Sequence, residues 1–238
     1  MTGNRAKGTG AAGTARAELT ALVARGVSWG AYTARVPTGP ASGRPAAVLV
    51  LFGVLDGLPA HHAGIAVPAD LDVLLVGRAS TLTHHSGQVA FPGGRIDTTD
   101  AGPEAAAVRE AVEETGLDAG GVDVLGTLGE LPLPVSNHLV TPVVAWWSRP
   151  SPVDVVDVRE SAAVFRTPVA DLLDPENRRT ATLRRGGAVH RGPAFLVGRD
   201  VVWGFTAIVL STMFDELDWT EPWDPARTIA APVPAGRS

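Results

Sequence analysis

The stretch Gly93–Leu117, which reads GGRIDTTDAGPEAAAVREAVEETGL, decides how the rest of the chain is interpreted. It predicts a helix over residues 101–116. Pro103 is suited to the first turn, Glu104 carries a negative charge near the positive end of the helix dipole, and Gly116 is placed to end the helix. The segments before and after this helix are interpreted in relation to it.

Three glutamates, Glu110, Glu113 and Glu114, fall within one arc of this helix, because positions i, i+3 and i+4 share a face. The residues expected to form the packed side lie opposite them and are Ala105, Val108 and Val112. Each close pair of like charges costs about 0.2–0.5 kcal/mol in an isolated helix. Arg109 can reach Glu113 one turn later, but one arginine does not neutralise three carboxylates.

Two interpretations of this acidic face are open from the helix alone. It is either an ordinary solvated surface or a site for a hard divalent cation such as Mg²⁺, which prefers oxygen ligands. The turn Phe91-Pro92-Gly93-Gly94 lies directly before the helix. Glycine permits a positive φ angle and close approach of a backbone carbonyl to a metal or ligand, which favours the second interpretation.

The spacing of these residues resembles the Nudix box, G-x5-E-x7-R-E-U-x-E-E-x-G-U, in which U is aliphatic. Gly94 begins the match, and the block Arg109–Leu117, REAVEETGL, follows the pattern in order and spacing. The chain departs from the pattern at Asp100, which replaces the first glutamate, and has one additional residue between Asp100 and Arg109.

Both departures are typical of one subgroup, the coenzyme A pyrophosphatases, which the upstream run Leu74–Asp97, LLVGRASTLTHHSGQVAFPGGRID, also resembles. Three positions differ from the subgroup signature: Val76 stands for threonine, Ala79 for serine and Thr83 for arginine. Segments 140–144, 165–175 and 202–207 are also similar, so that the resemblance covers roughly residues 45–217.

The resemblance implies hydrolysis of a diphosphate bond with Mg²⁺ or Mn²⁺ as cofactor. Glu110, Glu113 and Glu114, with the backbone carbonyl of Gly93, would hold the cation, and Arg109 would orient the glutamates. Glu110 is the first choice for the general base, and Glu114 and Arg109 complete the implied catalytic set. Glu130 and Glu160 are outside candidates for the base, each also interpretable as a plain surface acid.

Substrate contact is assigned by the same resemblance to Arg78, His85 and Gln88. The implied substrate is coenzyme A, cleaved to 3′,5′-ADP and 4′-phosphopantetheine. A broader Nudix hydrolase acting on ADP-ribose, NADH or another nucleoside diphosphate derivative remains an alternative. A catalytically silent nucleotide-sensing module is a second alternative, although such modules usually lose a metal-binding glutamate and all three are present here.

Composition bounds the function further. The chain has 238 residues, a formal net charge of −5 and a pI of about 5.7, which argue against non-specific nucleic-acid binding. It has no cysteine, so thiolate metal sites and cysteine nucleophiles are excluded, and a reducing compartment is favoured. No stretch approaches the roughly 20 apolar residues that span a bilayer. We therefore expect a cytoplasmic enzyme of small nucleotides, without a membrane or nucleic-acid partner.

The expected fold is α+β, the Nudix fold, in which a mixed β-sheet lies between α-helices. Further helices are predicted at 15–27, 168–174 and 203–217, and strands at 46–54, 71–76, 122–128, 139–147 and 162–166. The expected organisation is a tail with one short helix over residues 1–44, a catalytic domain over 45–217 and a loose Pro-rich tail over 218–238. The apolar helix 203–217 either packs on the core or forms a homodimer contact.

Overall fold

A computed structural model of the chain describes residues 12–30, 32, 43–55, 58–64, 66–78, 88–133, 136–157 and 161–233. Its helices are α1 (Ala12–Arg25), α2 (Pro103–Thr115), α3 (Val169–Leu173) and α4 (Gly204–Glu216). The larger sheet contains β1 (Arg44–Gly53), β2 (Asp72–Arg78), β3 (Val89–Ala90), β4 (Gly93–Arg95), β5 (Val122–Thr127), β6 (Leu131–Leu133), β7 (His138–Trp147) and β8 (Ser161–Pro168). The smaller sheet contains β9 (Arg178–Arg185), β10 (Ala188–Val197), β11 (Asp200–Trp203) and β12 (Thr228–Ala230).

The larger sheet is mixed, as the sequence predicted. β1 runs parallel to β7, from the pair Arg44 and His138 to the pair Phe52 and Trp146, whereas its pairing with β2 and β4 is antiparallel. β1 and β7 are mostly apolar, and most of their residues are buried. Such strands suit the centre of a sheet that is covered on both faces.

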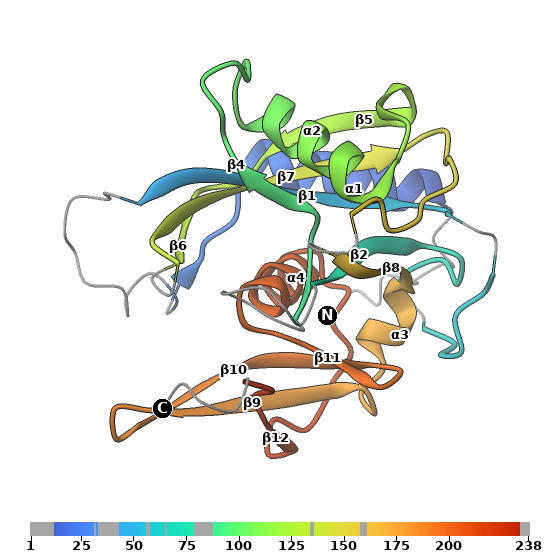
Figure 1. The fold of residues 1–238 in the computed structure, drawn as a ribbon. Helices are drawn as coiled ribbons and strands as arrows, with labels where there is room; N and C mark the ends of the chain where they lie inside the picture. Colours follow the sequence, from blue (N-terminus) through green and yellow to red (C-terminus); the bar gives the residue numbers. More distant parts are fainter. Residues whose placement is uncertain are drawn as a thin grey trace.

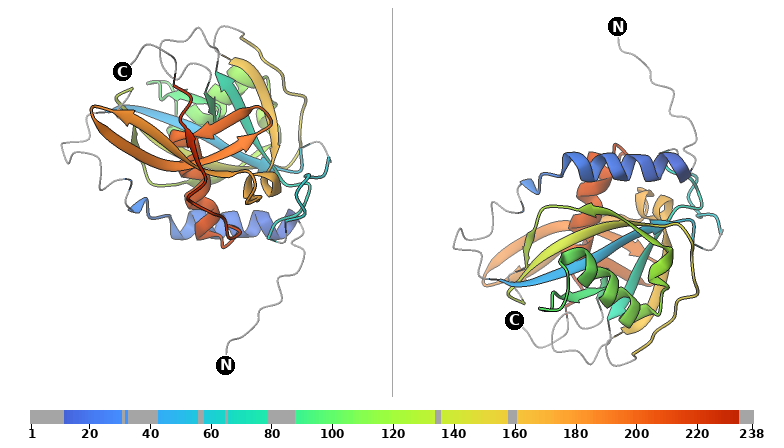
Figure 2. Two further views of the ribbon diagram at one scale, coloured as in Figure 1. Left: turned by 90° about the horizontal axis from the view of Figure 1, so that it is seen from below. Right: turned by 90° about the horizontal axis from the view of Figure 1, so that it is seen from above.

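Helices cover both faces of this sheet, which confirms the α+β arrangement (Figures 1 and 2). Leu49 and Leu51 of β1 pack toward α2, while Val50 and Phe52 point to the opposite face. There they meet residues of α1, α3, α4 and the smaller sheet. Alternate side chains of a strand point to opposite faces, so one apolar strand supplies both cores.

The packed side of α2 agrees in part with the sequence prediction. Val108 and Val112 are partly buried and pack against the core, as predicted, whereas Ala105 is exposed. The fully buried side chains of this helix are those of Ala106, Ala107, Ala111, Glu114 and Thr115. Small alanines let the helix approach the sheet closely. The buried carboxylate of Glu114 is tolerated because a backbone amide donates to it.

The smaller sheet was not predicted. The sequence of β9, RRTATLRR, has two arginines at each end and threonine, alanine and leucine between them, so it offers no apolar run from which to predict a strand. The chain after residue 218 is also more ordered than expected. Trp219 is buried and β12 pairs in parallel with β9, so the expectation of a loose C-terminal segment is wrong for residues 219–231.

The helix predicted at 203–217 is α4, and most of its side chains are buried in the core. Among the described residues, no helix is both long and apolar enough to cross a membrane.

Candidate active site

Gly93 and Gly94 begin β4 and lie against the second half of α2, next to Glu110 and Glu114. Gly93 has a φ angle of +154°, and a Cβ atom there would meet the carbonyl oxygen of Ala47 and lie 2.6 Å from the Cα atom of Val48. A Cβ atom on Gly94 would lie 2.5 Å from the carboxyl carbon of Glu110. Both positions require glycine, because any side chain would displace either the central strand or the glutamate.

Glu114 joins this turn to α2. Its side chain is only 6% exposed, and its Oε2 atom accepts a hydrogen bond from the backbone N–H of Gly93 at 3.1 Å. Nη1 of Arg78, at the end of β2, lies 3.9 Å from the Oε1 atom of the same carboxylate. The Nε–H of Arg78 is buried and has no hydrogen-bond partner within the described part of the chain. A buried donor of this kind is satisfied when an acceptor binds beside it.

Arg109 connects the remaining acids. Its Nε and Nη2 atoms donate to the two oxygens of Asp100, each at 3.0 Å, and Nη1 donates to Glu110 at 3.0 Å and to Glu113 at 3.1 Å. Its Nη2 atom also donates to the backbone carbonyl of Arg95. The hydrogen bonds from Arg109 hold the pKa of Asp100 below its usual range, and those to the acids raise the pKa of Arg109. Arg109 therefore holds glutamates in place and has little capacity left for a substrate.

The carboxyl group of Glu110 is the member of this cluster whose pKa is raised. Burial is the largest cause, because it disfavours the charged form. The hydrogen bond and the charge of Arg109 act in the opposite direction, while the negative charges of Glu113 and Asp97 add to the increase. A carboxylate with a raised pKa binds a proton more readily near neutral pH, which suits a general base.

The donor atoms of the cluster fit a hard divalent cation. Glu110, Glu113 and Glu114 offer carboxylate oxygens, and Gly93 adds a backbone carbonyl, whereas Mg²⁺ and Mn²⁺ prefer oxygen ligands. One nitrogen of Arg109 contacts both Glu110 and Glu113, so these two carboxylates lie close together. Among the described residues, however, no three acidic or histidine side chains already converge on one metal position. Their oxygens face Arg109 and the Gly93 amide, and ligation would require them to exchange these partners.

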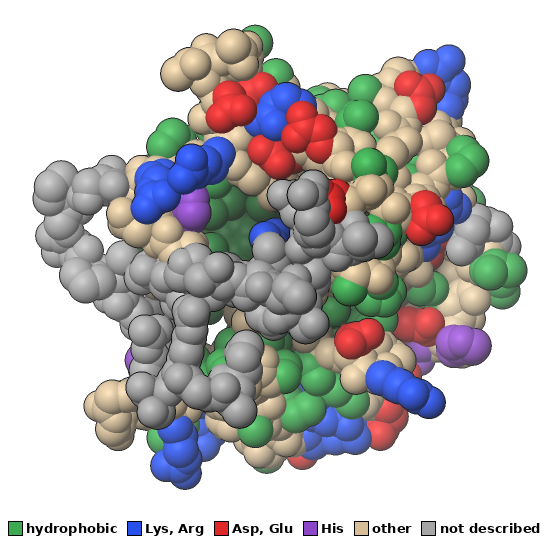
Figure 3. Space-filling model, in the orientation of Figure 1, with side chains coloured by type: hydrophobic (Ala, Val, Ile, Leu, Met, Phe, Trp, Pro, Cys, Tyr) green, Lys and Arg blue, Asp and Glu red, His purple; other side chains and the backbone are tan. Residues whose placement is uncertain are grey.

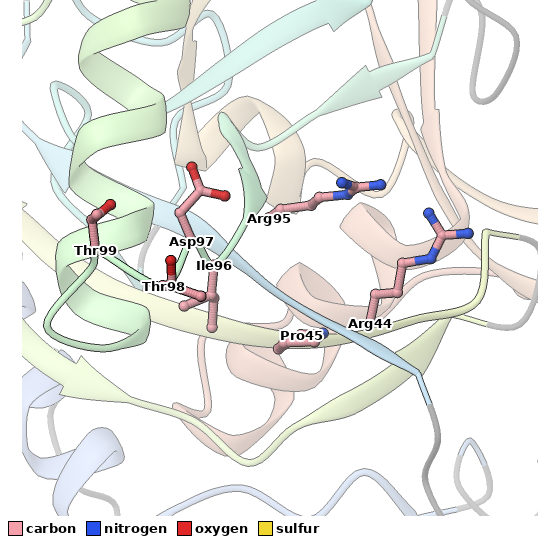
Figure 4. Close-up of a pocket in the computed structure, with 7 residues that line it drawn as sticks. All are labelled: Arg44, Pro45, Arg95, Ile96, Asp97, Thr98 and Thr99. Carbon is pink, nitrogen blue, oxygen red and sulfur yellow. The ribbon is translucent and has the colours of Figure 1, made fainter.

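A pocket adjoins the acids where β4 ends and β1 begins. It has a volume of about 500 Å³ and is lined by Arg44, Pro45, Arg95, Ile96, Asp97, Thr98 and Thr99 (Figure 4). Asp97 lies 3.8 Å from Nη2 of Arg109, so the pocket and the acidic cluster share a boundary. In the space-filling view, acidic side chains gather at the top of the molecule. A hollow lies below them, and basic side chains lie at its left edge (Figure 3).

Residues 59–183, more than half of the chain, match the sequence model of the NUDIX domain. The chain belongs to the Nudix family. It is 38% identical over 159 residues to an uncharacterised Nudix hydrolase, NudL, of Cronobacter sakazakii, a match that covers 65% of this chain and 82% of that protein. NudL of Yersinia enterocolitica is 32% identical over 165 residues, with coverage of 66% and 82%.

Among solved structures, the Nudix hydrolase RenU of M. smegmatis is 28% identical, with a TM-score of 0.42 over 55% of this chain and 74% of that one. The match to the NUDIX domain and the two curated relatives show that the chain is a Nudix pyrophosphohydrolase. Enzymes of this family act on small nucleotide substrates and generally use divalent metal ions such as Mg²⁺ or Mn²⁺.

The structure brings Gly93, Arg109 and the three glutamates of the Nudix helix α2 together, with Arg78 beside them. Gln88 is tied to this group through its backbone, because its carbonyl accepts the N–H of Arg78 at 2.9 Å. Glu130 is exposed between β5 and β6. Other candidates lie outside the described residues: His85, Glu160 and the signature positions Ala79 and Thr83.

Two features of the Nudix site were missed in the sequence. Asp100 was seen only as a departure from the box, yet it is the main partner of Arg109. Its side chain also accepts the backbone N–H of Asp97 at 2.8 Å, a turn that the spacing D-x-x-D could have indicated. The position of Arg44 beside Arg95, in the pocket next to the acids, was the second missed feature. It was not predictable, because it depends on the register between β1 and β4.

Proposed function

We propose that this Nudix enzyme hydrolyses the diphosphate bond of coenzyme A or its derivatives, giving 3′,5′-ADP and 4′-phosphopantetheine. The position of Arg78 supports this most directly. Arg78 belongs to the upstream signature that resembles the coenzyme A pyrophosphatases, and its guanidinium lies against Glu114 of the Nudix helix. The substrate-specific part of the sequence and the general Nudix box therefore meet at one point.

Binding of the diphosphate is assigned in this proposal to Arg78, Gln88 and His85. The Nε–H of Arg78, which has no acceptor within the described chain, would donate to a phosphate oxygen. Val76, one of the three differences from the subgroup signature, is fully buried in β2. That difference is therefore internal to the sheet and does not remove a contact with the substrate.

Metal binding is assigned to Glu110, Glu113, Glu114 and the carbonyl of Gly93. A bound Mg²⁺ or Mn²⁺ would neutralise the diphosphate charge and make the attacking water more acidic. Arg109, anchored by Asp100, would keep Glu110 and Glu113 on the side of the helix that faces the substrate.

The reaction itself needs a positioned water molecule and a group that accepts its proton. The water oxygen forms a bond to one phosphorus atom, the bond from that phosphorus to the bridging oxygen breaks, and the electron pair remains on the departing phosphate. Glu110 accepts the proton of the water in this proposal. Its partly buried carboxylate and raised pKa support that role over Glu130, which is exposed.

The test is an incubation of the purified protein with coenzyme A and Mg²⁺ or Mn²⁺, in parallel with ADP-ribose and NADH. Products are separated by chromatography. We expect 3′,5′-ADP and 4′-phosphopantetheine from coenzyme A, and we expect both to disappear when EDTA is added. A Glu114→Gln variant, which keeps an acceptor oxygen for the Gly93 amide, is the control for contaminating activity.

Other outcomes have distinct meanings. Cleavage of ADP-ribose or NADH with coenzyme A intact would retain the metal-binding helix and replace the proposed substrate with that of the broader alternative. Background activity on all substrates with either metal would support the silent nucleotide-sensing alternative instead.

A further inference from the structure

We infer that Arg44 and Arg95 form a second anion-binding site, which takes a phosphomonoester carried by the nucleoside next to the scissile diphosphate. The inference rests on the proposed diphosphate hydrolysis and narrows its substrate class. It assigns the enzyme to substrates with a phosphorylated ribose and not to ADP-ribose or NADH, which lack that group.

The register of the sheet places the two arginines together. Arg95 of β4 pairs with Ala46 of β1, and Arg44 lies two residues before Ala46. Residues two apart on a strand share a face, and so do directly paired residues, so Arg44 and Arg95 are diagonal neighbours on one face. The close-up view agrees, since both side chains extend in the same direction from adjacent strands (Figure 4).

Both guanidinium groups are available to bind a ligand. The two side chains are exposed, and within the described residues neither guanidinium makes an ion pair or hydrogen bond. Asp97 is the one acid among the residues that line the pocket, and its carboxylate lies 3.8 Å from Arg109. The pocket lining therefore carries two arginines without an ion-pair partner among the described residues, against one acid, in a chain whose net charge is −5.

A phosphomonoester fits this arrangement better than other polar groups. Guanidinium groups bind phosphate oxygens with pairs of parallel hydrogen bonds, and the hydroxyl groups of Thr98 and Thr99 line the same pocket. A divalent cation is excluded by the two arginines. A base or an amide would leave their charges without a counter-ion.

The two arginines also adjoin the proposed diphosphate site along β4. Arg95 lies two residues from Gly93 along β4, which corresponds to about 7 Å of extended strand. Gly94 faces Glu110 on the α2 side, and Arg95, one position later, faces the opposite side of the sheet. A nucleotide that crosses the glycine turn would thus place its diphosphate at the acids and its ribose phosphate at the arginines.

The main experiment compares coenzyme A with 3′-dephospho-coenzyme A, which differ only in the phosphomonoester. We would measure kcat/KM for the wild type, Arg44→Gln, Arg95→Gln and the double variant. Arg184→Gln, which removes an exposed arginine of β9 in the smaller sheet, is the matched control. In the double variant the ratio of the two kcat/KM values should fall about 10- to 100-fold toward dephospho-coenzyme A, mainly through KM.

An unchanged ratio in the double variant would overturn the inference and leave the proposed hydrolysis standing. A parallel comparison of NADPH with NADH shows whether a 2′-phosphate also reaches the site.

A binding measurement separates failure of the inference from failure of the proposed function. Titration calorimetry without metal would compare 3′,5′-ADP with 5′-AMP for the wild type and the double variant. We expect 3′,5′-ADP to bind about 10- to 100-fold more tightly than 5′-AMP to the wild type, and the difference to be lost in the double variant. The calorimetry decides the inference even if neither coenzyme A compound is cleaved. The inference is refuted if the wild type binds 3′,5′-ADP and 5′-AMP equally tightly, or if the double variant keeps the wild-type preference for 3′,5′-ADP.

Discussion

Substitution of Gly94 by alanine should abolish most activity while leaving the fold intact. Gly94 has an ordinary φ angle and lies between β1 and the carboxylate of Glu110. The new methyl group would lie 2.5 Å from the carboxyl carbon of Glu110, whereas ordinary van der Waals contact begins at 3.4 Å. The carboxylate must therefore move by about 0.9 Å, the difference between these two distances.

A displacement of that size is sufficient to impair catalysis. A misplacement of about 1 Å in a catalytic group can cost about 100-fold in rate, which corresponds to roughly 2.7 kcal/mol of transition-state stabilisation. Stability should change by less than about 1 kcal/mol. The clash is with the end of a flexible side chain, and alanine also reduces the conformational entropy of the unfolded chain.

The assay is kcat/KM for diphosphate hydrolysis as a function of Mn²⁺ concentration, together with thermal unfolding of the same protein. Gly93→Ala is the contrasting variant. Its methyl group would meet the backbone of Ala47 and Val48 in the central strand, at a φ angle of +154°. We expect it to lower the free energy of unfolding by about 3 kcal/mol, because backbone atoms of a packed strand cannot move aside.

The reasoning is refuted if Gly94→Ala has the kcat/KM and the Mn²⁺ dependence of the wild type. That result would mean that the carboxylate of Glu110 is not needed near the glycine turn. A Gly94→Ala protein that fails to fold would instead contradict the claim that only a flexible side chain occupies this space.

Further variants test the other contacts of the structure. Glu114→Gln should lower kcat by about 100-fold or more with a native circular dichroism spectrum, because the amide keeps the acceptor for Gly93 but loses the charge that binds metal. Arg109→Gln removes groups that lower the pKa of Glu110, so that pKa should rise further. The acidic limb of the kcat/KM profile should then move to higher pH, and an unmoved limb would show that another group sets it. Trp223→Ala should lower the free energy of unfolding by about 1–2 kcal/mol in urea titrations, because its ring stacks on the buried guanidinium of Arg178 at 4.8 Å.

The elements with strong local signals were predictable from the sequence. The apolar runs of β1, β2 and β7, the ends of α2 and the apolar helix α4 all lie close to their expected positions. In α2, Gly116 indeed ends the helix in the left-handed conformation, and its N–H donates to the carbonyl of Val112. Such features depend on local propensity and periodicity, so the sequence alone is sufficient to predict them.

The missed features depend on long-range contacts. The fully buried residues of α2 were missed because alanine carries little hydrophobic signal, and because the burial of Glu114 depends on an amide 21 residues away. The smaller sheet was missed because β9 has its arginine at position 178 buried between the rings of Phe195 and Trp223. A periodicity argument counts arginine as a surface residue, whereas here stacking compensates for part of its burial.

The short strand β4 contacts groups of opposite charge on its two faces, the carboxylates of α2 on one and Arg44 on the other. Gly94 and Arg95 are adjacent, so the strand alternation directs one toward the carboxylates of α2 and the other toward Arg44 on the far side. The acids need a cation before they can accept an anionic diphosphate, whereas the arginines attract the anionic substrate directly. A substrate with a second phosphate therefore has an attractive contact that does not depend on the metal. Without metal, the enzyme should bind such a substrate more tightly than a diphosphate that lacks the second phosphate. The pairing of β1 with β4, which places Arg44 beside Arg95, would then determine the specificity of the enzyme.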